Sequence, residues 1–228
     1  AAEYGTALHK MIELIEGGKI GVRGKATDDQ ILEYLKSEQG RQDKELEIFS
    51  RRITGAKGAA GNANTMRMLE GLRQYAELKE KSGLSGELIS EKNVAAFIKV
   101  GNQIVKIAGT FDQLWKDMGT LVDLKSSSKV SPEYALQLNA SAKLIEGLFG
   151  EKPKAGKILQ MPKNPFSTGG VNAVDIVDDK IINAALAQAY KIHSAKTPKE
   201  RIAAYEEAVK ERYRFFSFGD ACFFLAKK

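Results

Sequence analysis

The feature that most constrains the fold is a change of hydrophobic period near residue 86. Before it, apolar residues recur at the three- and four-residue spacing of amphipathic helices, whereas residues 86–128 contain short runs of β-branched and aromatic residues. Gly101-Asn102 and Asp117-Met118-Gly119 interrupt these runs, and such residues between apolar runs are typical of hairpin turns. The sequence therefore predicts three consecutive antiparallel strands, arranged as a meander.

Helical patterns flank the predicted meander. The preceding part indicates a helix that ends at Gly17-Gly18, short polar helices over 28–37 and 42–50, a mobile Gly/Ala/Asn-rich loop over 54–65, and a helix over 64–81. The following part indicates a helix that starts at Ser131-Pro132 and ends at Gly147 or Gly150, strands over 156–162 and 171–177, and helices over 180–194 and 198–214.

This order of elements predicts an α/β fold. A meander followed by a crossover helix and further strands is typical of a mixed sheet with helices on both faces. We interpret residues 1–228 as a single domain, in which a helical segment over about 20–82 is inserted between the first helix and the sheet.

The composition limits the classes of function. With 35 Lys and Arg against 29 Asp and Glu, the net charge of +6 permits a polyanionic partner without requiring one. Cys222 is the only cysteine, which excludes an internal disulfide and an iron-sulfur cluster held by this chain alone. No run of 18 apolar residues occurs, so we expect a soluble, cytoplasmic protein with no membrane partner.

The stretch from Gly18 to Ala26 is rich in glycine, and glycine-rich loops often bind phosphate. Here Gly18, Gly21 and Gly24 are three residues apart, and Ala26 stands where a Ser or Thr would bind Mg²⁺. The spacing of a nucleotide-binding P-loop is therefore not met.

The second hairpin of the meander places two aspartates in apolar strands. If residues 116–119 form a four-residue loop that ends in a left-handed glycine, Trp115 pairs with Thr120. The same register places Asp112 opposite Asp123.

Like charges at opposed positions of a sheet are destabilising, so a compensating group is expected. Lys125 points to the same face as Asp123, because side chains alternate along a strand. One interpretation is a divalent cation held by Asp112 and Asp123, since hard cations prefer carboxylate oxygens. The other is a solvated salt bridge on a half-open sheet.

The pattern of Asp112 followed by Asp123-x-Lys125 resembles the signature of the PD-(D/E)XK nucleases, and most of all their RecB-like exonuclease branch, in a form without an iron-sulfur cluster. Further matches to that branch, in the family's order, are Gly5 and His9 on the first helix with Glu13 one turn later, Glu91 on the first strand, and Gln137 on the helix after the lysine.

The resemblance implies a restriction-endonuclease-like core and a metal-dependent nuclease that hydrolyses DNA phosphodiester bonds. It implies an exonuclease or end-processing enzyme of replication, recombination or repair, encoded by a bacterium, an archaeon or a phage. Its partners would be single-stranded DNA or DNA with free ends, and a recombination or single-strand-binding protein. The alternative functions are a nuclease-fold module that only binds DNA, and an unrelated Mg²⁺-dependent α/β protein.

The resemblance also implies roles for individual residues. One or two Mg²⁺ or Mn²⁺ ions would be bound by His9, Asp112, Asp123 and the backbone carbonyl of Leu124. Lys125 would orient the attacking water, with help from Gln137, and possible contributors are Glu13, Glu91 and Tyr134. Basic residues that could line a phosphate track, or be ordinary solvated charges, are Arg51, Arg52, Lys57, Lys129 and Lys143.

Overall fold

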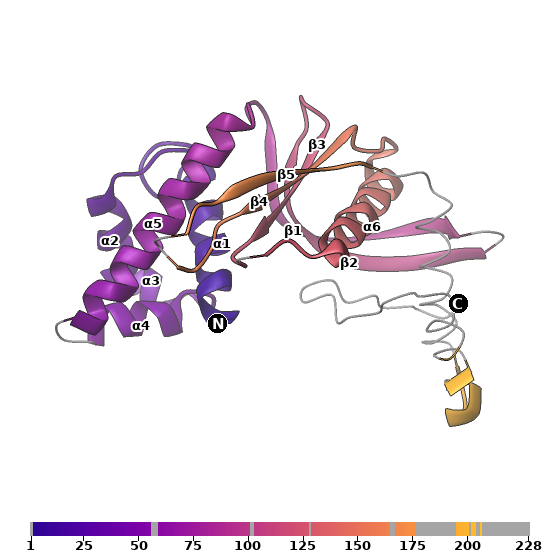
Figure 1. Cartoon of the computed structure of the whole chain (residues 1–228), viewed down its shortest axis with the longest axis horizontal. Helices are drawn as coiled ribbons and strands as arrows, with labels where there is room; N and C mark the ends of the chain where they lie inside the picture. Colours follow the sequence, from indigo (N-terminus) through magenta and orange to yellow (C-terminus); the bar gives the residue numbers. More distant parts are fainter. Residues whose placement is uncertain are drawn as a thin grey trace. The chain divides into compact units, whose positions relative to one another are not determined.

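The computed structural model describes residues 2–55, 59–100, 103–127, 129–164, 167–176 and, near the C-terminus, 195–200, 202–203 and 206. The helices predicted over 180–194 and 198–214 lie wholly or mostly outside these residues. Figure 1 shows the described elements, which are α1 (Ala2–Glu16), α2 (Asp28–Lys36), α3 (Glu38–Gln42), α4 (Glu47–Gly55), α5 (Ala59–Lys81), β1 (Leu88–Val100), β2 (Gln103–Trp115), β3 (Thr120–Lys125), α6 (Pro132–Phe149), β4 (Ala155–Gln160) and β5 (Gly170–Val174).

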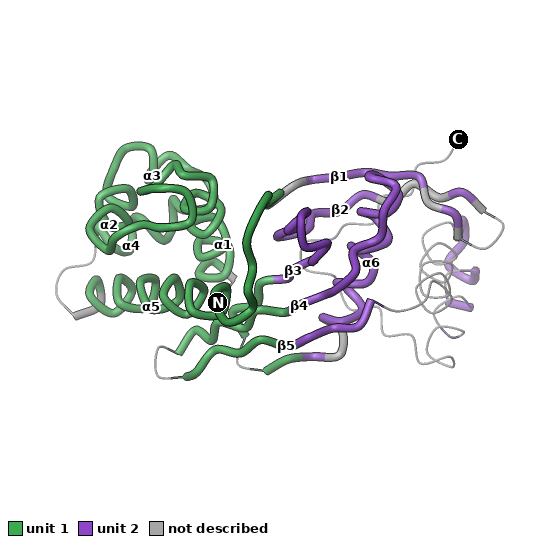
Figure 2. Tube along the Cα trace, turned by 90° about the horizontal axis from the view of Figure 1, so that it is seen from above, with its two compact units in different colours: residues 1–90, 124–130, 158–172 green, residues 91–123, 131–157, 173–228 purple. Residues whose placement is uncertain are grey.

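The chain divides into two compact units (Figure 2). Unit 1 comprises residues 1–90, 124–130 and 158–172, and unit 2 comprises residues 91–123, 131–157 and 173–228. Unit 1 contains the five helices α1 to α5, of which α2 to α5 fall within residues 20–82. That all residues form a single domain stays a prediction.

The core of unit 1 forms around the apolar face of α1. Leu8, Met11 and Ile12 of this helix are fully buried, as their three- and four-residue spacing predicts. The helix ends where expected: the N–H of Gly17 donates to the carbonyl of Glu13, and Gly18 takes a left-handed φ of 72°.

The start of α5 differs from the prediction. The segment over 54–65 was expected to be a mobile loop, but α5 already begins at Ala59. Alanine has the highest helix propensity, and Ala59, Ala60 and Ala63 offset the glycine among them. The helix propensity of the alanines therefore outweighs the effect of Gly61 in this stretch.

The five strands form one sheet with the order β1-β2-β3-β4-β5. β2 and β3 are antiparallel. At the start of β4 the N–H of Lys154 donates to the carbonyl of Gly119. At its end the N–H of Met161 donates to the carbonyl of Lys125. Both bonds join residues about 35 positions apart, so the two strands advance in the same direction from the first bond to the second. β3 and β4 therefore run parallel.

β4 and β5 run in opposite directions, because Gly169 lies against the carbonyl of Gln160 while Gly156 lies against that of Val174. The sheet is therefore mixed, and the α/β fold is confirmed at this level.

Helix α6 makes the crossover between β3 and β4. It has Pro132 in its first turn and ends at Gly150, whose φ is 80°. Within unit 2, α6 packs on β2 (Figure 1), and Gly156 of β4 leaves room for the side chain of Leu138. Within the described part of the chain, no helix is both long and apolar enough to cross a membrane.

Candidate functional site

The β2–β3 hairpin has the register that the turn predicts. Gly119 has a φ of 58°, Trp115 pairs with Thr120, and the ladder continues to Gln113 and Val122. The indole Nε1 of Trp115 donates to Oε1 of Gln113 at 3.2 Å, as neighbours on one face of a strand do. The predicted register is confirmed over these pairs.

Asp112 and Asp123 lie one position beyond the last of these pairs, and the same register continued by one residue places them opposite each other. Asp112 is half-buried and Asp123 is 8% exposed. Leu114 and Leu121, which alternation places on the same face, are buried as well. A buried carboxylate is costly unless it is compensated, so Asp123 is the most chemically distinctive residue of the hairpin.

Lys125 lies two residues further along β3 than Asp123 and belongs to unit 1. It is half-buried, and the side chain of Leu124 before it is buried. Ser126 after it packs against Gly5 of α1: a Cβ on Gly5 would lie 2.9 Å from Oγ of Ser126. Packing therefore accounts for Gly5, which precedes His9 by one helical turn.

The other predicted site residues fall on both units. His9 is half-buried on α1 in unit 1, whereas Tyr134 and Gln137 are half-buried on α6 in unit 2. Glu91 lies on β1, with its side chain outside the described residues, and Lys57 lies wholly outside them. Catalytic or metal-binding roles for these residues stay predictions.

Most of the remaining candidates take part in ion pairs with nearby acids or bases. These pairs are Lys10–Glu13 at 2.7 Å, Arg51–Glu47 at 2.5 Å, Arg52–Glu3 at 2.7 Å and Lys143–Glu146 at 2.9 Å. Lys129 is exposed. A phosphate contact by Arg51, Arg52 or Lys143 would compete with the carboxylate that each already contacts, which favours the interpretation as surface charge.

The donor set of the hairpin fits a hard divalent cation in part. Two carboxylates at opposed positions are suitable ligands for Mg²⁺, which commonly keeps several waters. Among the residues that the structure describes, no group of three or more His, Cys, Asp or Glu side chains is placed to hold a metal ion. A cation at Asp112 and Asp123 would therefore depend on water and carbonyl oxygens for its other ligands.

Two buried polar residues are not marked by any pattern in the sequence. Asn139 of α6 donates from Nδ2 to the carbonyls of Ala135 and Asp175, both at 3.0 Å, so it joins the helix to the segment after β5. Glu16 is 5% exposed at the end of α1 and contacts α5. A helical period marks positions as apolar or polar, but it does not show which polar residue is buried.

Comparison with known proteins points to a different part of the chain. Residues 177–224 match a family model described as "Queuosine biosynthesis protein". A curated relative, the S-adenosylmethionine:tRNA ribosyltransferase-isomerase of Lachnoclostridium phytofermentans, is 77% identical over 31 residues. That alignment covers 13% of this chain and 8% of the relative, so the chain spans less than a tenth of the relative's length.

A solved structure described as "Crystal structure of SSO0001" aligns with 69% of this chain and 71% of its own, at 16% sequence identity. The TM-score is 0.37, which is too low to support a conclusion about fold or function.

The matches contradict the prediction of a PD-(D/E)XK nuclease of the RecB-like branch, because the family model is described as a queuosine biosynthesis protein and the curated relative is named as a tRNA ribosyltransferase-isomerase. Deoxyribonuclease activity, DNA as the partner, a role in recombination or repair and the inactive DNA-binding alternative fall with it. The physical reason is that short motifs recur wherever packing favours them. Gly5 makes room for Ser126, and Glu13 pairs with Lys10.

The segment that matched, residues 177–224, contains none of the site residues that the sequence predicted. Its one unusual feature is a cluster of five phenylalanines within residues 215–224. Aromatic clusters of this kind occur both in packed cores and in surfaces that stack on bases, so composition alone does not separate the two.

Proposed function

We propose that this chain is part of a tRNA-modifying protein and that residues 177–224 carry its relation to queuosine synthesis. The observation that carries the proposal is the match of this segment to the family model. The curated relative supports it, because its name describes the transfer of a ribosyl group between S-adenosylmethionine and tRNA. The substrate class proposed for the chain is therefore tRNA.

The charge of the chain is compatible with this partner. The formal net charge is +6 and the isoelectric point is about 9.2. A cationic protein that neutralises phosphates releases counterions, so its affinity for RNA falls as the salt concentration rises. Within residues 177–224, Arg212 and Arg214 flank Tyr213 immediately before the phenylalanine cluster. Such a combination of cations and rings suits a nucleic acid with unpaired bases.

The experiment compares tRNA binding by the full chain and by two charge-matched double variants. Replacement of Arg212 and Arg214 by Glu is expected to weaken binding at least about tenfold, since two phosphate contacts become repulsions. The control replaces Lys19 and Arg23, outside the matched segment, by Glu. Equal weakening by both variants would show nonspecific electrostatic attraction and would contradict the proposed role of residues 177–224.

A second assay addresses the reaction. The full chain is incubated with tRNA and S-adenosylmethionine that carries a label in its ribosyl group, and the tRNA is then isolated. Ribosyl transfer by this chain predicts that label enters the tRNA. If label stays out while tRNA still binds, the chain supplies recognition and the chemistry requires the remaining length that the relative possesses.

We also propose a divalent cation at Asp112 and Asp123. Two observations support this site. Asp123 is buried, and the hairpin register, continued by one residue, places the two carboxylates opposite each other. A bound Mg²⁺ would offset the repulsion of the two carboxylates.

A further inference from the structure

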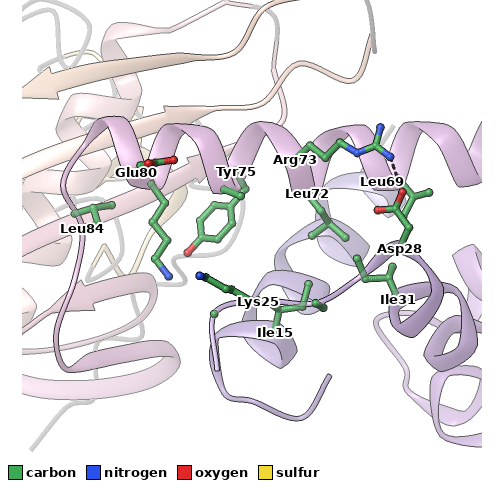
Figure 3. A pocket seen from close by; sticks show the side chains of 14 residues that line it. Ile15, Lys25, Asp28, Ile31, Leu69, Leu72, Arg73, Tyr75, Glu80 and Leu84 are labelled. Carbon is green, nitrogen blue, oxygen red and sulfur yellow. Dashed lines mark hydrogen bonds and ion pairs between the residues drawn. The ribbon is translucent and has the colours of Figure 1, made fainter. Parts of the chain in front are cut away.

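The helices of unit 1 line a half-open cavity of about 610 Å³, and its lining residues fall between Ile15 and Leu84. Its walls come from the end of α1, the glycine loop before α2, α2 itself and α5 (Figure 3). The volume falls within the range of cavities that bind small molecules, roughly 300–1,000 Å³.

One side of the cavity is apolar. The aliphatic side chains that line it are those of Ile15, Ile31, Leu69 and Leu72, whereas Leu84 lies next to Glu80 at the other end (Figure 3). At the rim of this side, Arg73 of α5 pairs with Asp28 of α2, and the dashed line in Figure 3 marks this contact. Because the pair neutralises itself, the apolar side offers a ligand no net charge.

The other side is polar and is lined by Tyr75, Lys79 and Glu80, with the carboxylate of Glu16 behind them. Lys79 donates from Nζ to both carboxylate oxygens of Glu16, at 2.6 and 2.8 Å, and the hydroxyl of Tyr75 donates to Oε1 at 3.0 Å. These three residues already satisfy one another. Lys79 is therefore occupied by Glu16 and is not the group that attracts a ligand.

Lys25 differs from these cations. Among the residues that the structure describes, no ion pair joins its ammonium group to a carboxylate, and Figure 3 shows this group directed toward the hydroxyl of Tyr75. Its backbone is held by paired hydrogen bonds with Val22, at 2.8 and 2.9 Å. Gly24 before it has a φ of 78° and lies against Nζ of Lys79, so the turn that presents Lys25 requires glycine here.

We propose that this cavity binds a small organic anion with an apolar body. The carboxylate, sulfonate or phosphate group of the ligand pairs with Lys25, and its apolar body lies along Ile31, Leu69 and Leu72. Because one side of the cavity is apolar and the other is polar, an amphipathic molecule fits it better than a purely polar or purely apolar one. The inference does not depend on the proposed role in tRNA modification.

The test uses 8-anilinonaphthalene-1-sulfonate, an aromatic anion whose fluorescence rises in apolar surroundings. One molecule is expected to bind per chain. Lys25→Gln is expected to weaken binding about tenfold, the usual effect of losing a charged hydrogen bond. Lys25 is exposed, so the variant is expected to stay folded, which far-ultraviolet circular dichroism checks. Lys19→Gln, on the same loop but outside the cavity, is the matched control and should bind like the wild type.

A second probe, dansylcadaverine, has a similar aromatic body but carries a positive charge, and it is expected to bind at least about tenfold more weakly than the sulfonate. Binding of the sulfonate that is unchanged by Lys25→Gln would overturn the proposal. So would equal affinity for the two probes, or no saturable binding of the sulfonate to the wild type.

Discussion

Lys79 of α5 donates two hydrogen bonds to the carboxylate of Glu16, which ends α1, although 63 positions of sequence separate the residues. Glu16 is 5% exposed, so this contact places a charge in the interior of unit 1. Tyr75, one turn before Lys79, donates to the same carboxylate. The end of the first helix is thereby fixed to the longest one.

Lys79→Met is expected to lower the free energy of unfolding by about 3 kcal/mol, because removal of one partner leaves a buried charge uncompensated. Urea unfolding monitored by circular dichroism measures the change. Arg51→Met is the control, since Arg51 and Glu47 form an exposed pair whose loss should cost less than about 1 kcal/mol. Equal losses would show that burial of Glu16 does not govern the energy of this contact.

Gly71→Ala is expected to destabilise the protein by about 1–3 kcal/mol, despite the higher helix propensity of alanine. A Cβ at this position would lie 2.3 Å from the hydroxyl of Tyr4 and 3.1 Å from Leu8. Gly55→Ala provides the comparison, because no described atom lies within 4 Å of a Cβ there. Thermal unfolding should separate the two variants, and a stabilised Gly71→Ala would refute the close packing of α1 against α5.

The stability of unit 1 should fall above pH 10. Burial, reinforced by Glu70 and opposed by Arg67, raises the pKa of Tyr4 from 10.0 to about 12. The unfolded chain therefore loses this proton first, and stability that is present below pH 10 is lost as the pH rises to 12, by about 3 kcal/mol in total. Unfolding measured between pH 9 and 12 should show this loss. In Tyr4→Phe the free energy of unfolding should fall less steeply with pH. An unchanged fall would show that another group causes it.

Mg²⁺ is expected to stabilise the wild type but not Asp123→Asn. At ten times the dissociation constant, a cation bound only by the folded chain adds about 1.4 kcal/mol, which raises the Tm by roughly 3–6 °C. Without Mg²⁺, the substitution should stabilise the hairpin by removing like-charge repulsion. Asp117→Asn, on the exposed turn of the same hairpin, should keep the full Mg²⁺ response. A Tm shift retained by Asp123→Asn would exclude the proposed cation site.

Much of the fold could be predicted because it depends on local patterns. The change of period at residue 86, the glycine of the 116–119 turn and the Ser131-Pro132 helix start determine elements that the structure contains. The start of α5 was predicted too late because alanine and glycine alternate there, and local rules weigh one against the other.

The site was harder to predict, since it depends on contacts between distant segments. The hairpin register followed from the length of the turn alone. The cavity of unit 1 depends on the packing of Gly24 against Lys79, which no local pattern indicates. The nuclease interpretation was wrong because it joined short motifs by their order alone. Each such motif can arise from packing, as Gly5 with Ser126 does, or from a helix ion pair, as Glu13 with Lys10 does.

The most direct measurement is the affinity of the full chain for an unmodified tRNA and for a DNA duplex of similar length, at one salt concentration and in the presence of Mg²⁺. We expect tRNA to bind at least about tenfold more tightly than the duplex, a difference of about 1.4 kcal/mol, and the DNA to remain intact. Equal or tighter binding of the duplex, or Mg²⁺-dependent degradation of the DNA, would contradict the proposed function.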